Sequence, residues 1–297
     1  MNKFFCFLLV SIVILLRTIV YSFDLNFLIT TLIETNDIQR IKALVNSGQV
    51  NINSANNLEE APPLILAVQH GNLNMVKELI NLGADINITD NIGLTPLYYS
   101  IYYNKPEVFK YLISKGANIN IKSTNNCKTI IAEAVKKNLI EAVTLLLEHG
   151  SDINTVDCYG NTPLMIVIDN KYNDIAKILI DKGAEIDKQN KYAAENTITY
   201  AIIVDNIEIV GYLIEKDKKN LNLQDSKYGE TPLMCAVVNG KVDIIKILLD
   251  HGADVNIKNK FNKTVLDYAE TCEPNPYHDK KTCDIIKDIL LSNTKIL

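Results

Sequence analysis

The chain repeats itself about every 33 residues, and this period constrains its fold more than any other feature. The segment Pro62–Ala67 returns as Thr95–Ser100 and as Thr231–Ala236, and weaker copies lie between and after them. The second residues of the copies are 63, 96, 130, 163, 197, 232 and 265. A second series of residues keeps the same period: Gly48, Gly83, Gly116, Gly150, Gly183, Asp217 and Gly252. Two motifs with one period predict a linear array of one supersecondary unit, not a globular enzyme domain.

Each copy predicts a pair of helices, so the expected fold class is all-α. Thr95, Thr162 and Thr231 suit an N-cap, and each precedes a Pro that suits the first helical position. The first helix should span about eight or nine residues, as in 97–104. The second helix has apolar residues at helical spacing, as in 244–249, and a Gly should end it in the left-handed conformation.

The combined pattern resembles the ankyrin repeat. Its parts are the Thr-Pro-Leu-x-x-Ala start, the apolar second helix and a closing Gly-Ala-Asp-Ile-Asn, with close matches at 149–154 and 251–256. The resemblance implies an ankyrin-repeat solenoid of stacked helix-turn-helix units with short β-turn fingers over residues 24–297. Eight repeats would start near residues 24, 58, 91, 125, 158, 192, 227 and 260.

Several copies depart from the pattern. Cys127 and Ala194 stand where a finger Gly is usual, so these turns are expected to be reshaped. The sixth repeat has Asp217 in place of the closing Gly and is one residue longer. The last repeat is interrupted over 270–281, where two prolines predict a surface loop before a final helix at 283–291.

Residues 1–22 do not fit the array. Lys3 precedes an apolar run over 4–16, which Arg17 ends. That run is too short to span a bilayer, which needs about 20 residues, and it fits the hydrophobic region of a signal peptide. Val20-Tyr21-Ser22 could be the cleavage site, so the chain is expected to be exported, to a secreted or periplasmic location. The alternative is an uncleaved membrane anchor with Arg17 at the interface.

Composition and motifs exclude several classes of function. The net charge is -5 and Lys and Arg do not cluster, which argues against nucleic-acid binding. We find no nucleophile arrangement, phosphate-binding glycine loop or metal-ligand pattern, so the chain is expected to be no enzyme and to need no cofactor or metal. An unfamiliar active site in the 270–281 loop remains the alternative.

The cysteines do not form a regular framework. With Cys6 in the leader, five remain, and their spacing is irregular. Cys235 is predicted to be a buried small hydrophobe, and Cys127 and Cys158 are predicted to be free thiols in turns of adjacent repeats.

Cys272 and Cys283 flank the last loop. They could form a disulfide in an oxidising compartment or stay free. A zinc site with His278 is the third alternative, but the spacing matches no common zinc pattern and a fourth ligand is missing.

Partners of ankyrin proteins usually dock on the concave face, which the fingers and the ends of the first helices build. The resemblance therefore implies protein–protein interaction without catalysis, with a monomeric chain and an unidentified partner such as a host protein. Exposed aromatic residues recur at these positions and are typical of interfaces. The alternative for any one of them is that it packs on the neighbouring finger and stiffens the row of fingers. Tyr98 and Tyr99 are expected in the core. The candidate binding residues are Gln69, His70, Ile92, Tyr102, Tyr103, Lys136, Tyr159, Asp169, Tyr192, Tyr228 and Phe261.

Overall fold

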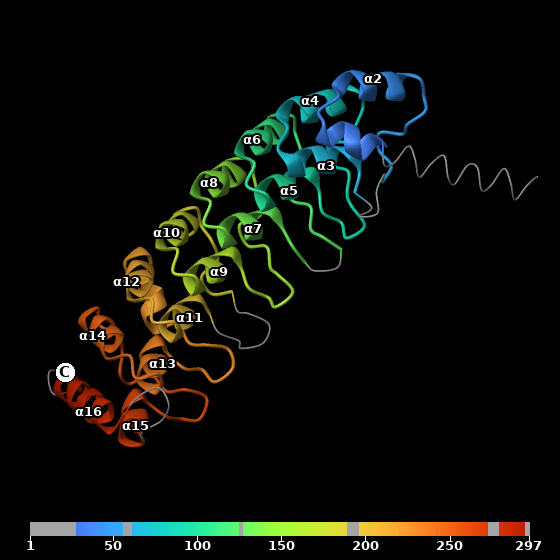
Figure 1. Cartoon of the computed structure of the whole chain (residues 1–297). Coiled ribbons are helices and arrows are strands. Elements are labelled where there is room, and N and C mark those ends of the chain that lie inside the picture. Colours follow the sequence, from blue (N-terminus) through green and yellow to red (C-terminus); the bar gives the residue numbers. More distant parts are fainter. Residues whose placement is uncertain (1–27, 56–60, 125–126, 189–195, 273–278, 295–297) are drawn as a thin grey trace, which may run out of the picture. The chain divides into compact units, whose positions relative to one another are not determined.

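The computed structural model describes residues 28–55, 61–124, 127–188, 196–272 and 279–294. In these ranges a helix–turn–helix repeat occurs eight times, which confirms the predicted all-α array (Figure 1). The first helices are residues 28–34, α3 (Pro63–His70), α5 (Pro96–Tyr102), α7 (Ile130–Lys136), α9 (Pro163–Asp169), α11 (Thr197–Ile203), α13 (Pro232–Val238) and α15 (Val265–Glu270). The second helices are α2 (Ile38–Asn46), α4 (Leu73–Asn81), α6 (Pro106–Ser114), α8 (Ile140–Glu148), α10 (Asn173–Asp181), α12 (Ile207–Lys216), α14 (Val242–Asp250) and α16 (Lys280–Thr294).

The chain divides into two compact units, Met1–Glu133 and Ala134–Leu297, and each is described by itself. Within each unit the first helices form one row, the second helices form another, and the fingers extend from the first-helix row (Figure 1). Within the described residues the finger backbones form no strand, only an isolated bridge between Lys122 and Thr129. The predicted leader, residues 1–22, lies outside the described residues. Among the helices that the structure does describe, none combines the length and the apolar character needed to cross a bilayer.

The helix starts follow the sequence prediction. The side chains of Thr95, Thr162 and Thr231 accept the backbone N–H three residues on, and Pro occupies the first helical position in each case. The weaker copies use the same device, because Asn196 caps α11 and Thr264 forms a capping box with Asp267. Each cap satisfies a backbone donor that the helix itself leaves unpaired.

Left-handed backbone recurs at fixed places in the repeats. The six glycines that close the second helices have φ between 73° and 94°, as predicted. Cys127 also takes a left-handed φ of 51°, close to the conformation of Gly93 and Gly160 at the equivalent finger positions. Residues 125–126 of that turn and Ala194 lie outside the described residues, so the predicted reshaping of these turns stays a prediction.

Three element boundaries differ from the prediction. Helix α5 ends at Tyr102 instead of 104, because Asn104 is left-handed with a φ of 53°. Helix α16 begins at Lys280 instead of 283, where the Asp279 carboxylate accepts the Thr282 N–H at 2.9 Å. In the sixth repeat a 3₁₀ helix, η1 (Lys218–Asn222), accommodates the extra residue.

The core follows the two helix rows. Helix α13 is buried from Pro232 to Val237, whereas α14 buries only one side, with Ile244, Ile245 and Leu248 inside. The first helices inside the array are thus largely enclosed, and the second helices are amphipathic, which leaves the ends of the first helices and the fingers as the surfaces that can vary.

Asparagine side chains join consecutive repeats. The Asn that ends the Gly-Ala-Asp-Ile-Asn motif accepts a backbone N–H of the next repeat through its side-chain carbonyl. These pairs are Asn53–Asp85 (2.8 Å), Asn87–Asn118 (2.7 Å), Asn154–Glu185 (2.9 Å) and Asn222–Asp254 (3.0 Å). These bonds lie at the surface and join each repeat to a fixed place on the next, so they contribute to the register between repeats.

Candidate functional site

In the first compact unit, the predicted site residues lie at the ends of α3 and α5 and in the finger before α5. The rings of Tyr102 and Tyr103 are 43% and 42% exposed, and their centroids lie 5.0 Å apart at an interplanar angle of 86°. Tyr98 stacks behind Tyr102 at 6.2 Å, and Tyr99 stacks behind Tyr103 at 5.9 Å. The exposed pair Tyr102 and Tyr103 thus packs against Tyr98 and Tyr99 of the same helix.

The supporting tyrosines are fixed by carboxylates. The Tyr98 hydroxyl donates to Glu133 at 2.9 Å, and the Tyr99 hydroxyl donates to Asp90 at 2.6 Å. Burial, followed by the hydrogen bond to Glu133, raises the pKa of Tyr98 well above its ordinary value, so this phenol stays neutral. Tyr98 is buried as predicted, whereas Tyr99 is half-buried.

The other predicted residues of this unit flank the tyrosines. His70 is exposed at the end of α3, Gln69 before it is half-buried, and α3 packs against α5. Ile92 is half-buried in the finger, where its N–H donates to Asp90. Asp90 thus holds both the finger and Tyr99, so one carboxylate positions two parts of this surface.

In the second compact unit, the predicted residues form no single cluster around one helix end. Lys136 is exposed at the end of α7, and Asp169 is exposed at the end of α9, where it accepts the Tyr200 hydroxyl at 3.0 Å. Tyr159 is 65% exposed on its finger. Tyr192 lies outside the described residues.

Tyr228 and Phe261 form the clearest exposed aromatic pair of this unit. They occupy the fingers of the seventh and eighth repeats and are 40% and 64% exposed, with ring centroids 6.1 Å apart. The Lys227 ammonium lies 4.6 Å from the centroid of the Tyr228 ring. The Lys260 N–H donates to the Tyr228 carbonyl at 2.9 Å, so the backbones of the two fingers are joined directly beside the rings.

Sequence reasoning missed the residues that hold these fingers. Tyr268 donates to Glu230 at 2.5 Å and accepts from the Asn259 amide at 2.8 Å. Burial and the bond to Glu230 raise the pKa of Tyr268 above its ordinary value. Tyr99 and Tyr268 both lie four residues after an N-cap Thr, and this shared spacing could have identified them.

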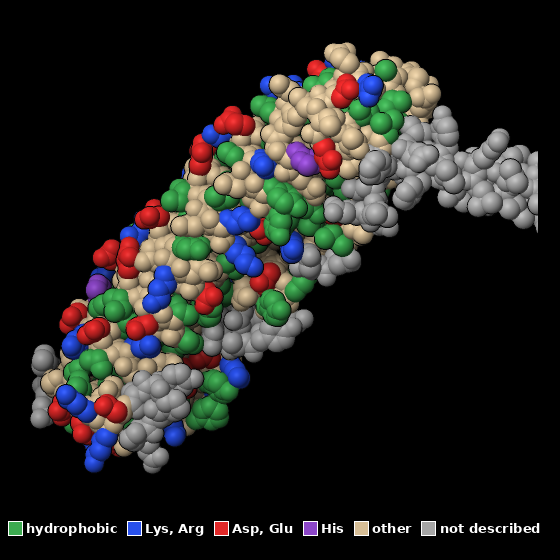
Figure 2. All heavy atoms as spheres, in the orientation of Figure 1, with side chains coloured by type: hydrophobic (Ala, Val, Ile, Leu, Met, Phe, Trp, Pro, Cys, Tyr) green, Lys and Arg blue, Asp and Glu red, His purple; other side chains and the backbone are tan. Residues whose placement is uncertain are grey.

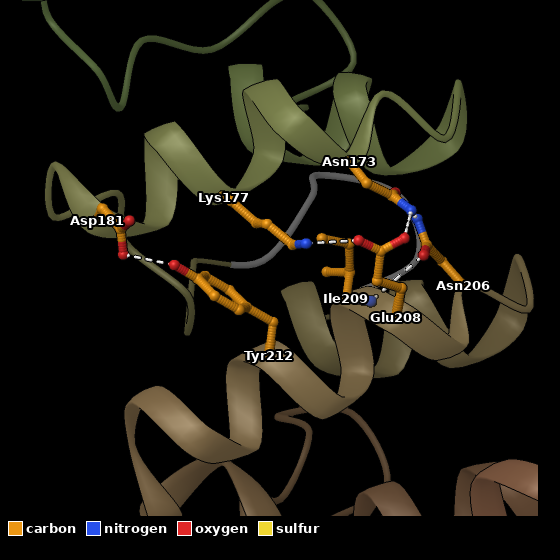
Figure 3. A network of polar contacts seen from close by, with 7 residues as sticks. All are labelled: Asn173, Lys177, Asp181, Asn206, Glu208, Ile209 and Tyr212. Carbon is orange, nitrogen blue, oxygen red and sulfur yellow. Dashed lines mark hydrogen bonds and ion pairs between the residues drawn. The ribbon is translucent and has the colours of Figure 1, made fainter.

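A polar network lies on the second helices, away from the fingers (Figure 3). Lys177 of α10 binds Glu208 of α12, and Asn173 donates to the same carboxylate at 2.6 Å. Asp181 accepts the Tyr212 hydroxyl at 2.8 Å and pairs with Lys216 at 2.6 Å.

Hydrogen bonding is the main cause of the shifted pKa values in this network. The bond from Lys177 holds the pKa of Glu208 below its ordinary value, and the bond from Lys216 does the same for Asp181. Each of these carboxylates has a counter-charge from the neighbouring helix, so the network ties α10 to α12 and offers no free acid or base.

The structure also resolves the cysteine alternatives. Cys272 and Cys283 form a disulfide with a Cα–Cα distance of 5.7 Å, so they cannot ligate zinc, and His278 lies outside the described residues. Cys127 and Cys158 are also disulfide-bonded, so the prediction of two free thiols is wrong. Irregular spacing along the sequence does not show which thiols are oxidised. Cys235 is buried, as predicted, and it is not part of a disulfide.

Charged and hydrophobic side chains alternate on the face drawn in Figure 2, and no charge of one sign dominates it. Within the described residues, no group of three or more His, Cys, Asp or Glu side chains could hold a metal ion. The arrangement described above offers exposed aromatic rings on rigid supports, which is the composition of a protein-binding surface.

Comparison with known proteins establishes the family. The family model for ankyrin repeats (3 copies) matches residues 29–123, 121–191 and 188–259. The chain therefore belongs to the ankyrin-repeat family, whose fold is a module for protein–protein interaction. The crystal structure of the ankyrin repeat domain of Bcl-3 is similar in fold, with a TM-score of 0.66 and 24% identity over 77% of this chain and 99% of that one.

Curated relatives come from several kinds of organism. "Putative palmitoyltransferase ZDHHC13" of Danio rerio is 30% identical over 207 residues, which is 70% of this chain and 32% of that protein. "Ankyrin repeat protein nuc-2" of Neurospora crassa is 27% identical over 80% of this chain and 22% of that protein. "Putative ankyrin repeat protein FPV219" of fowlpox virus is 29% identical over 79% of this chain and 60% of that protein. The chain thus spans less than two thirds of each of these relatives.

Proposed function

We propose that this chain is an exported ankyrin-repeat protein that binds another protein through its first-helix ends and fingers and performs no chemistry. The observation that carries the binding site is the exposed pair Tyr102 and Tyr103, supported by buried Tyr98. Tyrosine loses little conformational entropy on binding and gives a large contact area, so a fixed pair favours a hot spot.

The disulfides support export. Cys272–Cys283 and the half-cystines Cys127 and Cys158 need an oxidising compartment to persist. The apolar run over 4–16 supplies the expected signal-peptide region. A membrane-anchored scaffold is the second candidate, and it would keep residues 1–22 on the mature chain.

The titratable groups favour binding over catalysis. The strongest upward pKa shifts belong to Tyr98 and Tyr268, which donate hydrogen bonds to Glu133 and Glu230 inside the array. A phenol with a raised pKa is a poor base at neutral pH, and these two are already committed to structural bonds. An unfamiliar site in the 270–281 loop would be dismissed by a loop deletion that leaves all function intact.

Affinity capture with the full chain as bait, read by mass spectrometry, tests the binding surface. The variant Tyr102→Ala/Tyr103→Ala should reduce partner capture about tenfold or more, because truncated hot-spot residues cost about 2 kcal/mol or more. The matched control is Ile140→Ala/Ile207→Ala, which removes side chains that are 42% and 40% exposed on second helices. Retained capture by the tyrosine variant, with its helicity intact, would refute the site assignment.

N-terminal sequencing of the protein from membrane and soluble fractions tests export. A mature start at Phe23 supports a cleaved signal and rules out the tether. An intact N-terminus in the membrane fraction supports the anchored scaffold.

A further inference from the structure

Several hydrogen bonds link the fingers of the seventh and eighth repeats to each other. Besides the bond from the Lys260 N–H to the Tyr228 carbonyl, the Lys260 ammonium binds the carbonyl of Ser226. The Gln224 amide donates to the carbonyl of Lys258 at 3.1 Å, across the same gap. These links hold the two fingers as one element, and Tyr228 and Phe261 stand on it.

Side-chain hydrogen bonds within each finger also hold its backbone. The Asp225 carboxylate accepts the N–H of Tyr228 at 2.6 Å, and the side-chain Oδ1 of Asn259 accepts the N–H of Phe261 at 2.9 Å. Tyr268 then connects Asn259 to Glu230. The backbone beneath both exposed rings is therefore set before any partner arrives, which lowers the entropy cost of binding.

Lysines and acids surround the rings of Tyr228 and Phe261. Lys227, Lys258, Lys260 and Lys263 are all exposed. The nearby acids accept hydrogen bonds from the protein itself. Asp225 accepts backbone N–H groups of its finger, Asp267 accepts the Thr264 N–H at the start of α15, and Glu230 accepts from the Tyr268 hydroxyl. Asp267 also interacts electrostatically with Lys258 and Lys263, and the four lysines against the three acids Asp225, Glu230 and Asp267 leave a small positive excess around the rings.

We propose that this surface, the lysine-flanked pair Tyr228 and Phe261, binds an acidic segment of a partner protein that also carries an aromatic or large aliphatic side chain. The apolar side chain packs against Phe261, and the acidic residues pair with Lys258 and Lys263, because the Lys260 ammonium is held by the Ser226 carbonyl. The inference rests on the proposed protein-binding function and names the chemistry of the partner. It concerns a different surface from the Tyr102–Tyr103 pair.

Charge decides between the possible occupants. Basic and aromatic residues also occur together in single-stranded nucleic-acid sites. Such sites work within a positively charged protein surface, whereas this chain carries a net charge of -5. A short acidic peptide contacts only the local patch, so the negative charge elsewhere on the chain, beyond about one Debye length of 8 Å, is screened from it at physiological salt.

A selection from random peptides displayed on phage tests the proposal, with the purified full chain as the target. We expect the enriched peptides to combine Asp or Glu with Phe, Trp or Leu. Synthetic versions of them should bind about tenfold or more weakly to Phe261→Ala and to Lys258→Glu/Lys263→Glu. The charge-reversal variant should also lose most of the salt dependence of binding, because rim charges act through screened attraction.

Matched controls lie on α16, where Ile285 is 39% exposed and Lys287 is exposed. Ile285→Ala and Lys287→Glu should bind the peptides as the unaltered chain does, and circular dichroism checks that every variant folds. Enrichment of basic or uncharged peptides, equal binding to the finger variants, or no enrichment would overturn the proposal. Tighter binding of a mixed-sequence single-stranded oligonucleotide than of the peptides, or dimers in solution that Phe261→Ala disrupts, would assign the surface to another occupant.

The same peptides separate this proposal from the proposed function. If they bind but only Tyr102→Ala/Tyr103→Ala weakens them, protein binding stands and the finger site fails. If neither surface matters and no protein is captured, the proposed function fails as well.

Discussion

Replacing Tyr268 with Phe removes one oxygen atom and tests how the last two fingers are held. The hydroxyl donates to the Glu230 carboxylate at 2.5 Å and accepts from the Asn259 amide at 2.8 Å. A hydrogen bond to a charged group contributes about 1.5–3 kcal/mol, and a neutral one contributes about 0.5–1.5 kcal/mol. Tyr268 is only half-buried, so water replaces part of both bonds, and we expect a net loss of about 1–2 kcal/mol in local stability.

Amide hydrogen exchange measures this loss where it should occur. The N–H groups of Phe261 and Lys263 both donate to the side-chain Oδ1 of Asn259. The Nδ2 of the same side chain donates to the Tyr268 hydroxyl, so this hydroxyl positions the Asn259 side chain. A loss of about 1–2 kcal/mol should speed their exchange about 5- to 30-fold. Global unfolding is a poorer readout, because a repeat array need not unfold in one step.

The fifth repeat supplies an internal control. There Asp157 accepts the N–H groups of Tyr159 and Asn161 at 2.9 and 2.8 Å, but Ile166 stands in the position equivalent to Tyr268. Exchange at this finger should not change in the Tyr268→Phe variant. Unchanged exchange at Phe261, or an equal increase in the fifth repeat, would refute the role given to the hydroxyl.

Three further perturbations test other parts of the structure. Asn222→Ala removes the side-chain acceptor for the next repeat and should lower stability by about 1 kcal/mol in urea unfolding, whereas Asn256→Ala in the last copy of the motif should have little effect. Cys272→Ser opens the disulfide and should lower the free energy of unfolding by about 2–3 kcal/mol, mostly as faster exchange in α16. Because the bond from Lys177 lowers the pKa of Glu208, its stabilisation is present above the ordinary pKa of 4.5 and is lost as the pH falls through the folded-state value. Glu208→Gln should therefore flatten the fall of the melting temperature in this acidic range.

Each of these predictions has an outcome that would contradict it. Equal losses from Asn222→Ala and Asn256→Ala would show that the motif Asn acts within its own turn. Exchange in α16 that is the same with and without the disulfide would show that helix packing alone holds it. A Glu208→Gln variant with the same acid profile as the unaltered chain would assign the acid sensitivity to other carboxylates.

The period and the caps could be predicted because they depend on local chemistry. Thr95 and the glycines of the second-helix ends act on their own backbone, so their roles follow from the sequence. The contacts between repeats were harder to predict. In four repeats the Asn at this position bonds to a backbone N–H 31 or 32 residues away, as Asn222 does to Asp254, and nothing in its own repeat indicates that partner.

The candidate site was predicted in part. Exposure of Tyr102, Tyr103 and Phe261 follows from their places in the repeat. The sequence does not reveal which acids and lysines gather around each ring, since that depends on how neighbouring fingers meet. The disulfide-bonded state of Cys127 and Cys158 was also missed, because irregular spacing in the sequence does not show which thiols are oxidised.

The 3₁₀ helix η1 marks a place where the length of such a chain can change during evolution. It takes up one additional residue in the sixth repeat, and Asn222 at its end still reaches the Asp254 N–H. A small insertion at this joint therefore leaves every later repeat in phase. Length variation can accumulate there without altering the fingers, while the same insertion inside a helix would rotate every side chain that follows it.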